Sequence, residues 1–213
     1  MTLPLNITAK LTLVLGLFAA LLLAGVGALA SYNGRVALET ATIAALLSTA
    51  IEKEAALNAW VDDRQIDIAA LASSPRLNED VAELIAAAPA SAEAQVAHDR
   101  LVRNLQPWVG PEEQYLTLLV IETATGQVIA ATDPTEEGKF KEDRPFFVKG
   151  KDGPYVQNLH YALTLQELGM AAAAPLRSTE GQVLAVLAGQ LNLAEMNAII
   201  NRRTGLHQTD EAF

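Results

Sequence analysis

QVLAVLAGQLNL, residues 182–193, is the most informative segment of this chain. It is apolar at nearly every position, which is typical of a central strand that is buried on both faces. The turn Arg177-Ser178-Thr179-Glu180-Gly181 precedes it, and MAAAA (170–174) precedes the turn. Alanine favours a helix, but Gly169 and Pro175 bracket a window that is too short for one. We therefore predict that residues 170–174 form a strand that pairs with 182–193.

Three more strands are predicted upstream of this hairpin. YLTLLVIE (115–122) is β-branched and aliphatic, and QVIAAT (127–132) follows it after the tight turn TATG. A charged loop leads to a short helix over 143–150, with Asp143 as its N-cap. YVQNLHY (155–161) is predicted as the next strand. The order is therefore a hairpin, a long connection and a three-strand meander.

Helices are predicted on both sides of this strand-rich half. Residues 36–72 contain no Pro or Gly and are rich in Ala, Leu and Glu, so we expect one long helix there. Shorter helices are expected over 76–87 and 91–106, and a last one over 194–205 that ends at Gly205. The expected fold class is α+β, with a five-stranded antiparallel sheet flanked by helices.

The long helix carries an apolar seam that Glu54 and Arg64 interrupt. Its members alternate four and three residues apart: Ile43, Leu47, Ala50, Leu57, Val61, Ile68 and Leu71. Such a face packs either on the helix's own domain or on a second copy of the chain, and both are open on different stretches. The acidic pair Asp62-Asp63 is expected on a solvated face, and no chemistry is assigned to Trp60.

The N-terminus contains LTLVLGLFAALLLAGVGALA (11–30), twenty residues without a charge. As a helix it would span ~30 Å, the thickness of a bilayer's hydrocarbon core. Ala28-Leu29-Ala30 would suit cleavage of a signal peptide, but the apolar run is longer than the ~7–15 residues typical of such a peptide. We therefore favour an uncleaved anchor. Lys10, before the apolar span, favours export of the part of the chain that follows the span. Arg35, just after the span, weakens this preference.

Composition narrows the function classes further. The chain has 15 Lys and Arg against 25 Asp and Glu, and Lys10 is the only charged residue before residue 31. An acidic body without a basic stripe argues against nucleic acid as a partner. With no cysteine there are no disulfides, thiolate metal sites or cysteine nucleophiles. No GxSxG, HExxH or P-loop motif is present, and His98, His160 and His207 fall in three different segments. We expect no enzymatic activity, no metal and no cofactor.

Three segments together resemble the extracytoplasmic Cache domain (PDC type) of bacterial signal transducers. They are Asp143-Arg144-Pro145-Phe146-Phe147, Gly153-Pro154-Tyr155-Val156, and AAPLRSTEGQVLAVLAGQLNLAEM from Ala173 to Met196. The resemblance covers roughly residues 11–205 and implies a PAS-like sheet. NRRTGLHQTDEAF (201–213) resembles the stretch that leads into the second half of a double Cache module. In this family a second membrane helix and an output domain follow, such as a histidine kinase, a diguanylate cyclase or a chemotaxis signalling domain. We expect that output beyond residue 213, which makes this chain an input part.

The resemblance implies a division of the chain into five parts. They are a cytoplasmic N-terminus (1–10), a transmembrane anchor (11–30), a long helical stalk (31–72), the Cache sensor domain (73–205) and the start of a second Cache half (206–213).

The resemblance also implies where a ligand binds. In the family, small ligands lie on the sheet under the loop and helix between the second and third strands. Arg144 is the expected partner of a ligand carboxylate, because a guanidinium offers a planar bidentate fork. The remaining expected contacts are Phe146, Phe147, Tyr155, His160, Tyr161 and Gln190. For each of these residues a purely structural role is the competing interpretation.

One departure from the family pattern bears on the ligand. Members that bind amino acids use acidic side chains of the later strands to hold the α-amino group. Here Ala162-Leu163-Thr164 and Gln190 stand at those positions. We therefore expect no binding of ordinary α-amino acids through that motif, and a carboxylate or another small polar metabolite as the ligand.

The sequence thus predicts a membrane-bound sensor input module on the extracytoplasmic side of the inner membrane, forming a homodimer through the long helix. The alternative is an exported, membrane-anchored binding or scaffold protein that dimerises and does not signal.

Overall fold

The computed structural model describes residues 7–162 and 167–202. The chain divides into two compact units, Met1–Glu52 and Lys53–Phe213. Helix α1 (Ile7–Ala72) contributes residues to both units. Residues 163–166 and the C-terminus from residue 203, with Gly205 and His207, lie outside the described part.

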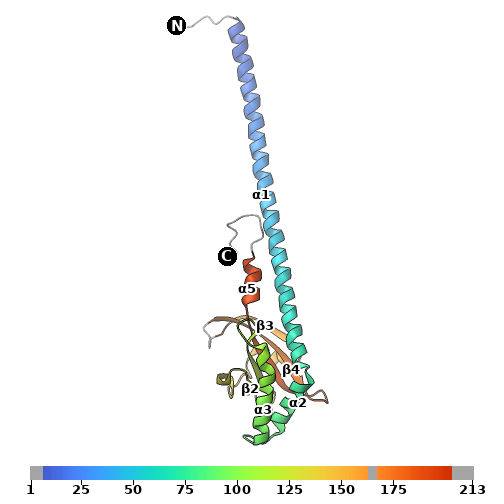
Figure 1. The fold of residues 1–213 in the computed structure, drawn as a ribbon. Coiled ribbons are helices and arrows are strands. Elements are labelled where there is room, and N and C mark those ends of the chain that lie inside the picture. The colour runs from blue at the N-terminus through green and yellow to red at the C-terminus, as the bar shows by residue number, and fades with distance from the viewer. Residues whose placement is uncertain (1–6, 163–166, 203–213) are drawn as a thin grey trace. The chain divides into compact units, whose positions relative to one another are not determined.

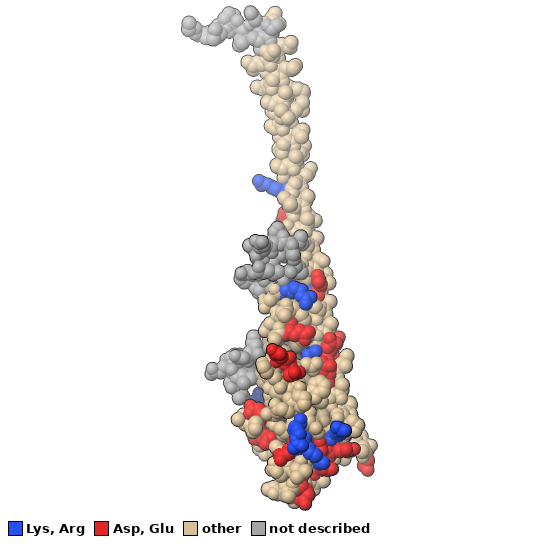
Figure 2. Space-filling view, in the orientation of Figure 1, with Lys and Arg blue, Asp and Glu red and all other residues tan. Residues whose placement is uncertain are grey.

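The first unit contains the apolar part of α1. Within Lys10–Ala72 lies a stretch that is long and apolar enough to cross a membrane. No charged residue occurs between Lys10 and Arg35, and the corresponding length of helix has no coloured side chain in Figure 2. Its leucines, among them Leu15 and Leu23, are exposed. These properties fit a transmembrane segment.

The second unit is built around a five-stranded antiparallel sheet (Figure 1). The order of its strands is β2-β1-β5-β4-β3. Its strands are β1 (Tyr115–Glu122), β2 (Val128–Ala131), β3 (Tyr155–Ala162), β4 (Glu167–Arg177) and β5 (Val183–Leu191). The α+β class and the hairpin-then-meander order are confirmed. Strand β5 is central and is buried from Ala185 to Gly189, as its apolar run predicts.

Helices precede, interrupt and follow the sheet. They are α2 (Pro75–Ala86), α3 (Ala92–Leu105), the 3₁₀ turns η1 (Gln106–Trp108) and η2 (Pro134–Glu136), α4 (Pro145–Gly150) and α5 (Ala194–Asn201). The prediction of Asp143 as an N-cap was wrong. The helix begins one residue later than that cap implies, with Arg144 as N-cap, because Pro145 takes the first helical position that suits its fixed φ angle.

The two faces of the sheet belong to two separate apolar cores. One face packs with α1, α2 and α3, and its core includes Ile68, Leu101 and Leu187. The other face packs with α4 through Phe147. The alanines of β4 alternate between the two cores, since Ala172 and Ala174 belong to the first and Ala173 to the second. Burial on both faces thus overrides their helix propensity.

The apolar seam of α1 is buried in its later part and exposed in its earlier part. Leu57 and Val61 are partly buried against the unit's core, and Ile68 and Leu71 are buried in it. This stretch packs on its own domain, which confirms one of the two interpretations for it. The earlier members Ile43, Leu47 and Ala50 are exposed in the structure, so packing on a second copy stays a prediction for them. The acidic pair Asp62-Asp63 is exposed, as expected.

Candidate ligand-binding site

Helix α4 sits directly on strands β4 and β5. Phe147 is only 2% exposed and belongs to the core on this face. Gly150 allows the close approach, since a Cβ added there would lie 2.9 Å from both Ala173 Cβ and Val186 Cγ1. We call this side of the sheet the α4 face. Phe147 of α4 covers the apolar part of this face.

A polar row crosses the α4 face beside this apolar part. The strand register aligns four residues on four neighbouring strands: Gln157, Ala171, Gln190 and Thr117. Each lies two residues from a member of the adjacent row: Tyr155, Ala173, Ala188 and Leu119. Ala173, Ala188 and Leu119 belong to the α4-side core, and side chains two residues apart on a strand share a face. The polar row therefore presents the amides of Gln157 and Gln190 on either side of the small side chain of Ala171. The Thr117 hydroxyl, 3.3 Å from Thr132 Oγ1, lies beyond Gln190.

Gln157 connects this row to α4. Its Oε1 accepts a hydrogen bond of 3.2 Å from the backbone N–H of Phe146. That N–H belongs to the first turn of the helix, where backbone donors have no partner inside the helix. The bond leaves the Gln157 amide N–H₂ group as the donor on this side of the site.

Three basic side chains flank the α4 face. Arg144 is exposed, and its Nε lies 3.6 Å from the Asp143 carboxylate. Lys149 Nζ lies 4.8 Å from the centre of the Tyr155 ring, and Lys151 Nζ lies 4.9 Å from that of Phe147. Within the described residues, the polar row contains no acidic side chain. The arrangement suits an anion better than a cation.

The structure brings together four of the seven predicted site residues. Phe146, Phe147, Tyr155 and Gln190 lie on or against the α4 face, with Phe147 in the core and Tyr155 half-buried. Arg144 lies at its rim.

The other two predicted residues lie on β3. His160 stands opposite Gly169 and Tyr161 opposite Leu168, but the side chains of both lie outside the described residues. The same holds for the segment Ala162-Leu163-Thr164 that was matched to the family's amine-binding positions. Ligand contact by each of the seven residues stays a prediction.

Gln157 and Thr117 of the polar row were not predicted from the sequence. Gln157 had a readable signal, because it lies two residues after Tyr155 on the same predicted strand and therefore shares its face. Thr117 had none, since it joins the row only through the pairing of β1 with β5.

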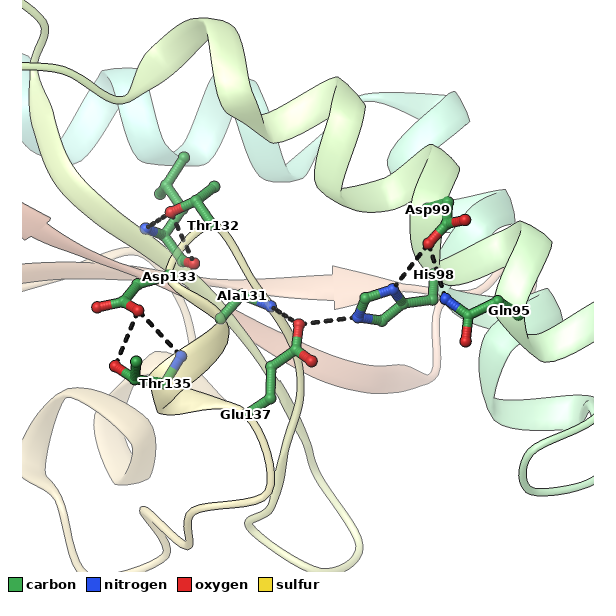
Figure 3. A network of polar contacts seen from close by, with 9 residues as sticks. Gln95, His98, Asp99, Ala131, Thr132, Asp133, Thr135 and Glu137 are labelled. Carbon is green, nitrogen blue, oxygen red and sulfur yellow. Dashed lines mark hydrogen bonds and ion pairs between the residues drawn. The ribbon is translucent and has the colours of Figure 1, made fainter.

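The connection between β2 and α4 is held to α3 by a polar network (Figure 3). His98 Nε2 lies 2.8 Å from Glu137 Oε1, which also accepts a bond of 3.0 Å from the N–H of Ala131. Hydrogen bonds from Gln95 and His98 lower the pKa of Asp99. The backbone N–H and hydroxyl of Thr135 lower that of Asp133. The network fixes the start of the loop that leads to the candidate site.

No family model matches this sequence, and no curated protein matches it either. Solved structures do. The sensor domain of the Vibrio cholerae histidine kinase DctB has a TM-score of 0.55 at 15% identity, over 74% of this chain and 58% of that one.

Two ligand-binding domains of Pseudomonas aeruginosa amino acid chemoreceptors also match. They are PctC in complex with GABA (TM-score 0.46, 20% identity, 72% of this chain and 65% of that one) and PctB in complex with L-Arg (0.45, 22%, 68% and 56%). This chain spans less than two thirds of each of these three chains. In its fold this chain is similar to the DctB sensor domain, as the resemblance to Cache sensors implies.

Proposed function

We propose that this chain is the input module of a membrane-bound bacterial signal transducer and that it binds a small carboxylate or similar polar metabolite on the α4 face. The fold shared with the DctB sensor domain carries the proposal. A sensor fold alone names no ligand. The ligand class comes from the side chains on the α4 face.

An anionic ligand fits the charges there. Arg144, Lys149 and Lys151 flank a row of neutral donors, and a carboxylate accepts hydrogen bonds from amides, hydroxyls and guanidinium alike. A cationic α-amino group would need a carboxylate or several carbonyl oxygens. Gln190, at a position where amino-acid receptors of the family carry an acidic residue, offers one neutral carbonyl. We therefore propose a ligand without an α-amino group.

The apolar part of α1 would anchor the module. A span without charge from Leu11 to Ala30 supports membrane insertion, with residues 1–10 in the cytoplasm and the sheet domain outside. The exposed side chains of Ile43, Leu47 and Ala50 would form the homodimer seam.

Isothermal titration calorimetry on the full chain in detergent tests the ligand class. The panel is acetate, succinate, malate and citrate on one side, and glycine, L-leucine, L-arginine and GABA on the other. We expect binding of at least one carboxylate without an amine, weakened tenfold or more by Arg144→Ala and by Gln190→Ala. Arg103→Ala, an exposed arginine on α3, is the matched control. Micromolar binding of an α-amino acid that Gln190→Ala abolishes would contradict the proposal.

The second candidate is an anchored binding or scaffold protein that dimerises without signalling. The exposed apolar side chains Ile43, Leu46, Leu47 and Ile51 favour it, because they suit a helix–helix contact whatever the sheet binds. A dimer in light scattering whose melting temperature none of the eight compounds shifts would support this candidate over the sensor.

A further inference from the structure

Helix α5, the last described helix, is fastened to α1 at three points. Lys53 Nζ donates to the carbonyl of Ile200 at 2.6 Å, and Trp60 Nε1 donates to Glu195 Oε2 at 3.0 Å. Arg64 Nη1 lies 4.0 Å from the same Glu195 oxygen, and its guanidinium lies 5.8 Å from the Trp60 ring. We call these contacts the α5 clamp. The Arg64–Glu195 pair is its weakest member, because the Glu195 side chain is 63% exposed and the separation is at the limit for an ion pair.

Two polar atoms in the core behind this clamp are unsatisfied. Arg64 Nε and the Tyr115 hydroxyl are both buried, with no hydrogen-bond partner among the residues that the structure describes. Burial raises the pKa of Tyr115 above its usual value, so its hydroxyl keeps its proton. The charge of Asp67 raises this pKa further, and that of Arg64 lowers it. A buried donor without a partner costs about 1–3 kcal/mol. The observed arrangement therefore leaves both groups in need of a partner.

The two unsatisfied groups complement each other. The Arg64 Nε–H is a donor only, whereas a tyrosine oxygen accepts as well as donates. Arg64 holds Asp67 at 3.2 Å through Nη2, so a small rotation of its guanidinium would keep that ion pair while it changes what Nε and Nη1 face. Turning Nε towards Tyr115 would draw Nη1 away from Glu195.

Tyr115 also touches the strand that carries Gln190. A Cβ added to Gly189 would lie 2.5 Å from Tyr115 Cδ1, so the ring packs against the β5 backbone at that residue. Gly189 faces the α1 side of the sheet and its neighbour Gln190 faces the α4 side. A shift of β5 at residues 189–190 therefore moves the Tyr115 ring.

We propose that Arg64 is a two-position switch: it pairs with Glu195 when α5 is clamped, and its Nε–H donates to the Tyr115 hydroxyl when α5 is released. The role of β5 in setting this switch rests on the proposed ligand site. The exchange of partners itself does not, because every group in it lies on the α1 side of the sheet. The population of the released state then determines what fraction of the molecules has α5 detached from α1.

Hydrogen–deuterium exchange of α5 in the full chain, in detergent and without any ligand, tests the switch. Tyr115→Phe removes the alternative partner and one unsatisfied atom, so we expect exchange of the α5 amides to slow by about tenfold, the equivalent of one hydrogen bond. Tyr32→Phe, at an exposed tyrosine of α1 outside the second unit, is the matched control and should leave α5 unchanged. Faster exchange in Tyr115→Phe, or a lower melting temperature, would mean that the hydroxyl already stabilises the clamped state, and would overturn the proposal.

A double-mutant cycle distinguishes a switch from two separate contacts. Glu195→Gln weakens the clamp, so α5 should exchange faster than in the wild type. If Arg64 can pair with only one of Glu195 and Tyr115 at a time, the effects of Glu195→Gln and Tyr115→Phe on α5 amide exchange are coupled. Effects that simply multiply would contradict the switch. Failure of the calorimetric panel would leave this result standing, because no ligand enters the experiment.

Discussion

Gly189 allows two large side chains to pack against β5 on the α1 side of the sheet. Its missing side chain makes room for the ring of Tyr115, since an added Cβ would lie 2.5 Å from Tyr115 Cδ1 and 2.8 Å from Leu118 Cδ2. Both side chains are fully buried and have no free direction in which to move. We expect Gly189→Ala to destabilise the domain by about 2 kcal/mol through overpacking, as measured by urea unfolding. Gly153→Ala is the control, because an added Cβ there meets nothing within 4 Å. Equal stability of the two variants would contradict this packing.

Ala90 holds the turn between α2 and α3 in a conformation that suits glycine. Its φ of 60° makes it the one residue other than glycine with positive φ in the described part of the chain. A left-handed conformation costs an L-residue about 1 kcal/mol, and the side chain is exposed, so it loses no packing when removed. We expect Ala90→Gly to raise the melting temperature, whereas Ala88→Gly in the same turn should lower it or leave it unchanged. A lower melting temperature for Ala90→Gly would count against the assigned turn.

Among the helices, α2 and α3 are joined by one buried carboxylate in addition to their shared apolar core. Asp80 is 6% exposed; its Oδ1 lies 3.0 Å from Arg100 Nε, and its Oδ2 accepts from Asn104 at 2.9 Å. Arg100 also pairs with the exposed Glu83. Asp80→Ala removes the acceptor of the Asn104 amide and the charge partner of the Arg100 guanidinium, so it should cost about 2 kcal/mol in urea unfolding. Glu79→Ala, one position earlier and exposed, should change stability little. A similar loss in both variants would mean that helix propensity rather than the buried carboxylate matters.

Elements were predictable from the sequence where local pattern decides them. The apolar run of β5 predicts that strand, and Gly169 and Pro175 exclude a helix over residues 170–174, although β4 itself runs past both of them, from Glu167 to Arg177. Contacts between residues that are far apart in the sequence leave no such local trace. Trp60 had no predicted role, and its hydrogen bond to Glu195 joins residues 135 positions apart. The polar row on the α4 face was only partly foreseen for the same reason, because strand pairing rather than spacing brings Thr117 beside Gln190.

At the scale of the whole molecule, three carboxyl groups with lowered pKa values make stability depend on pH. Burial would raise the pKa of Glu136, but hydrogen bonds from Lys139 and Lys141 outweigh it and lower the pKa below its usual 4.5. Asp99 and Asp133 are shifted below their usual 3.8. A folded-state pKa below the unfolded-state value stabilises the fold fully above the latter, and this contribution is lost as the pH falls through the former.

We therefore expect a melting temperature that is steady from pH 7 to about 5 and falls as the pH drops below about 4.5. Glu136→Gln should flatten part of that fall, since the variant has no proton to take up. Glu112→Gln, an exposed carboxylate in the turn before β1, should leave the profile as it is. A profile that Glu136→Gln leaves unchanged would show that its two lysine contacts do not stabilise the fold.

The orientation of the whole chain in a membrane is open to a direct measurement, because the chain has no cysteine and a single introduced one is the only site for a thiol label. In intact spheroplasts, a membrane-impermeant maleimide should label Glu112→Cys, while Thr2→Cys should react only after permeabilisation. The prediction follows from Lys10, which lies before the apolar span and favours retention of that end in the cytoplasm, although Arg35 lies soon after the span and opposes it. The reverse labelling pattern would contradict an exported sensor domain.

A mature protein that lacks residues 1–30 by mass would instead identify the apolar span as a cleaved signal peptide, and the domain would then reach the membrane only through another part of the transducer.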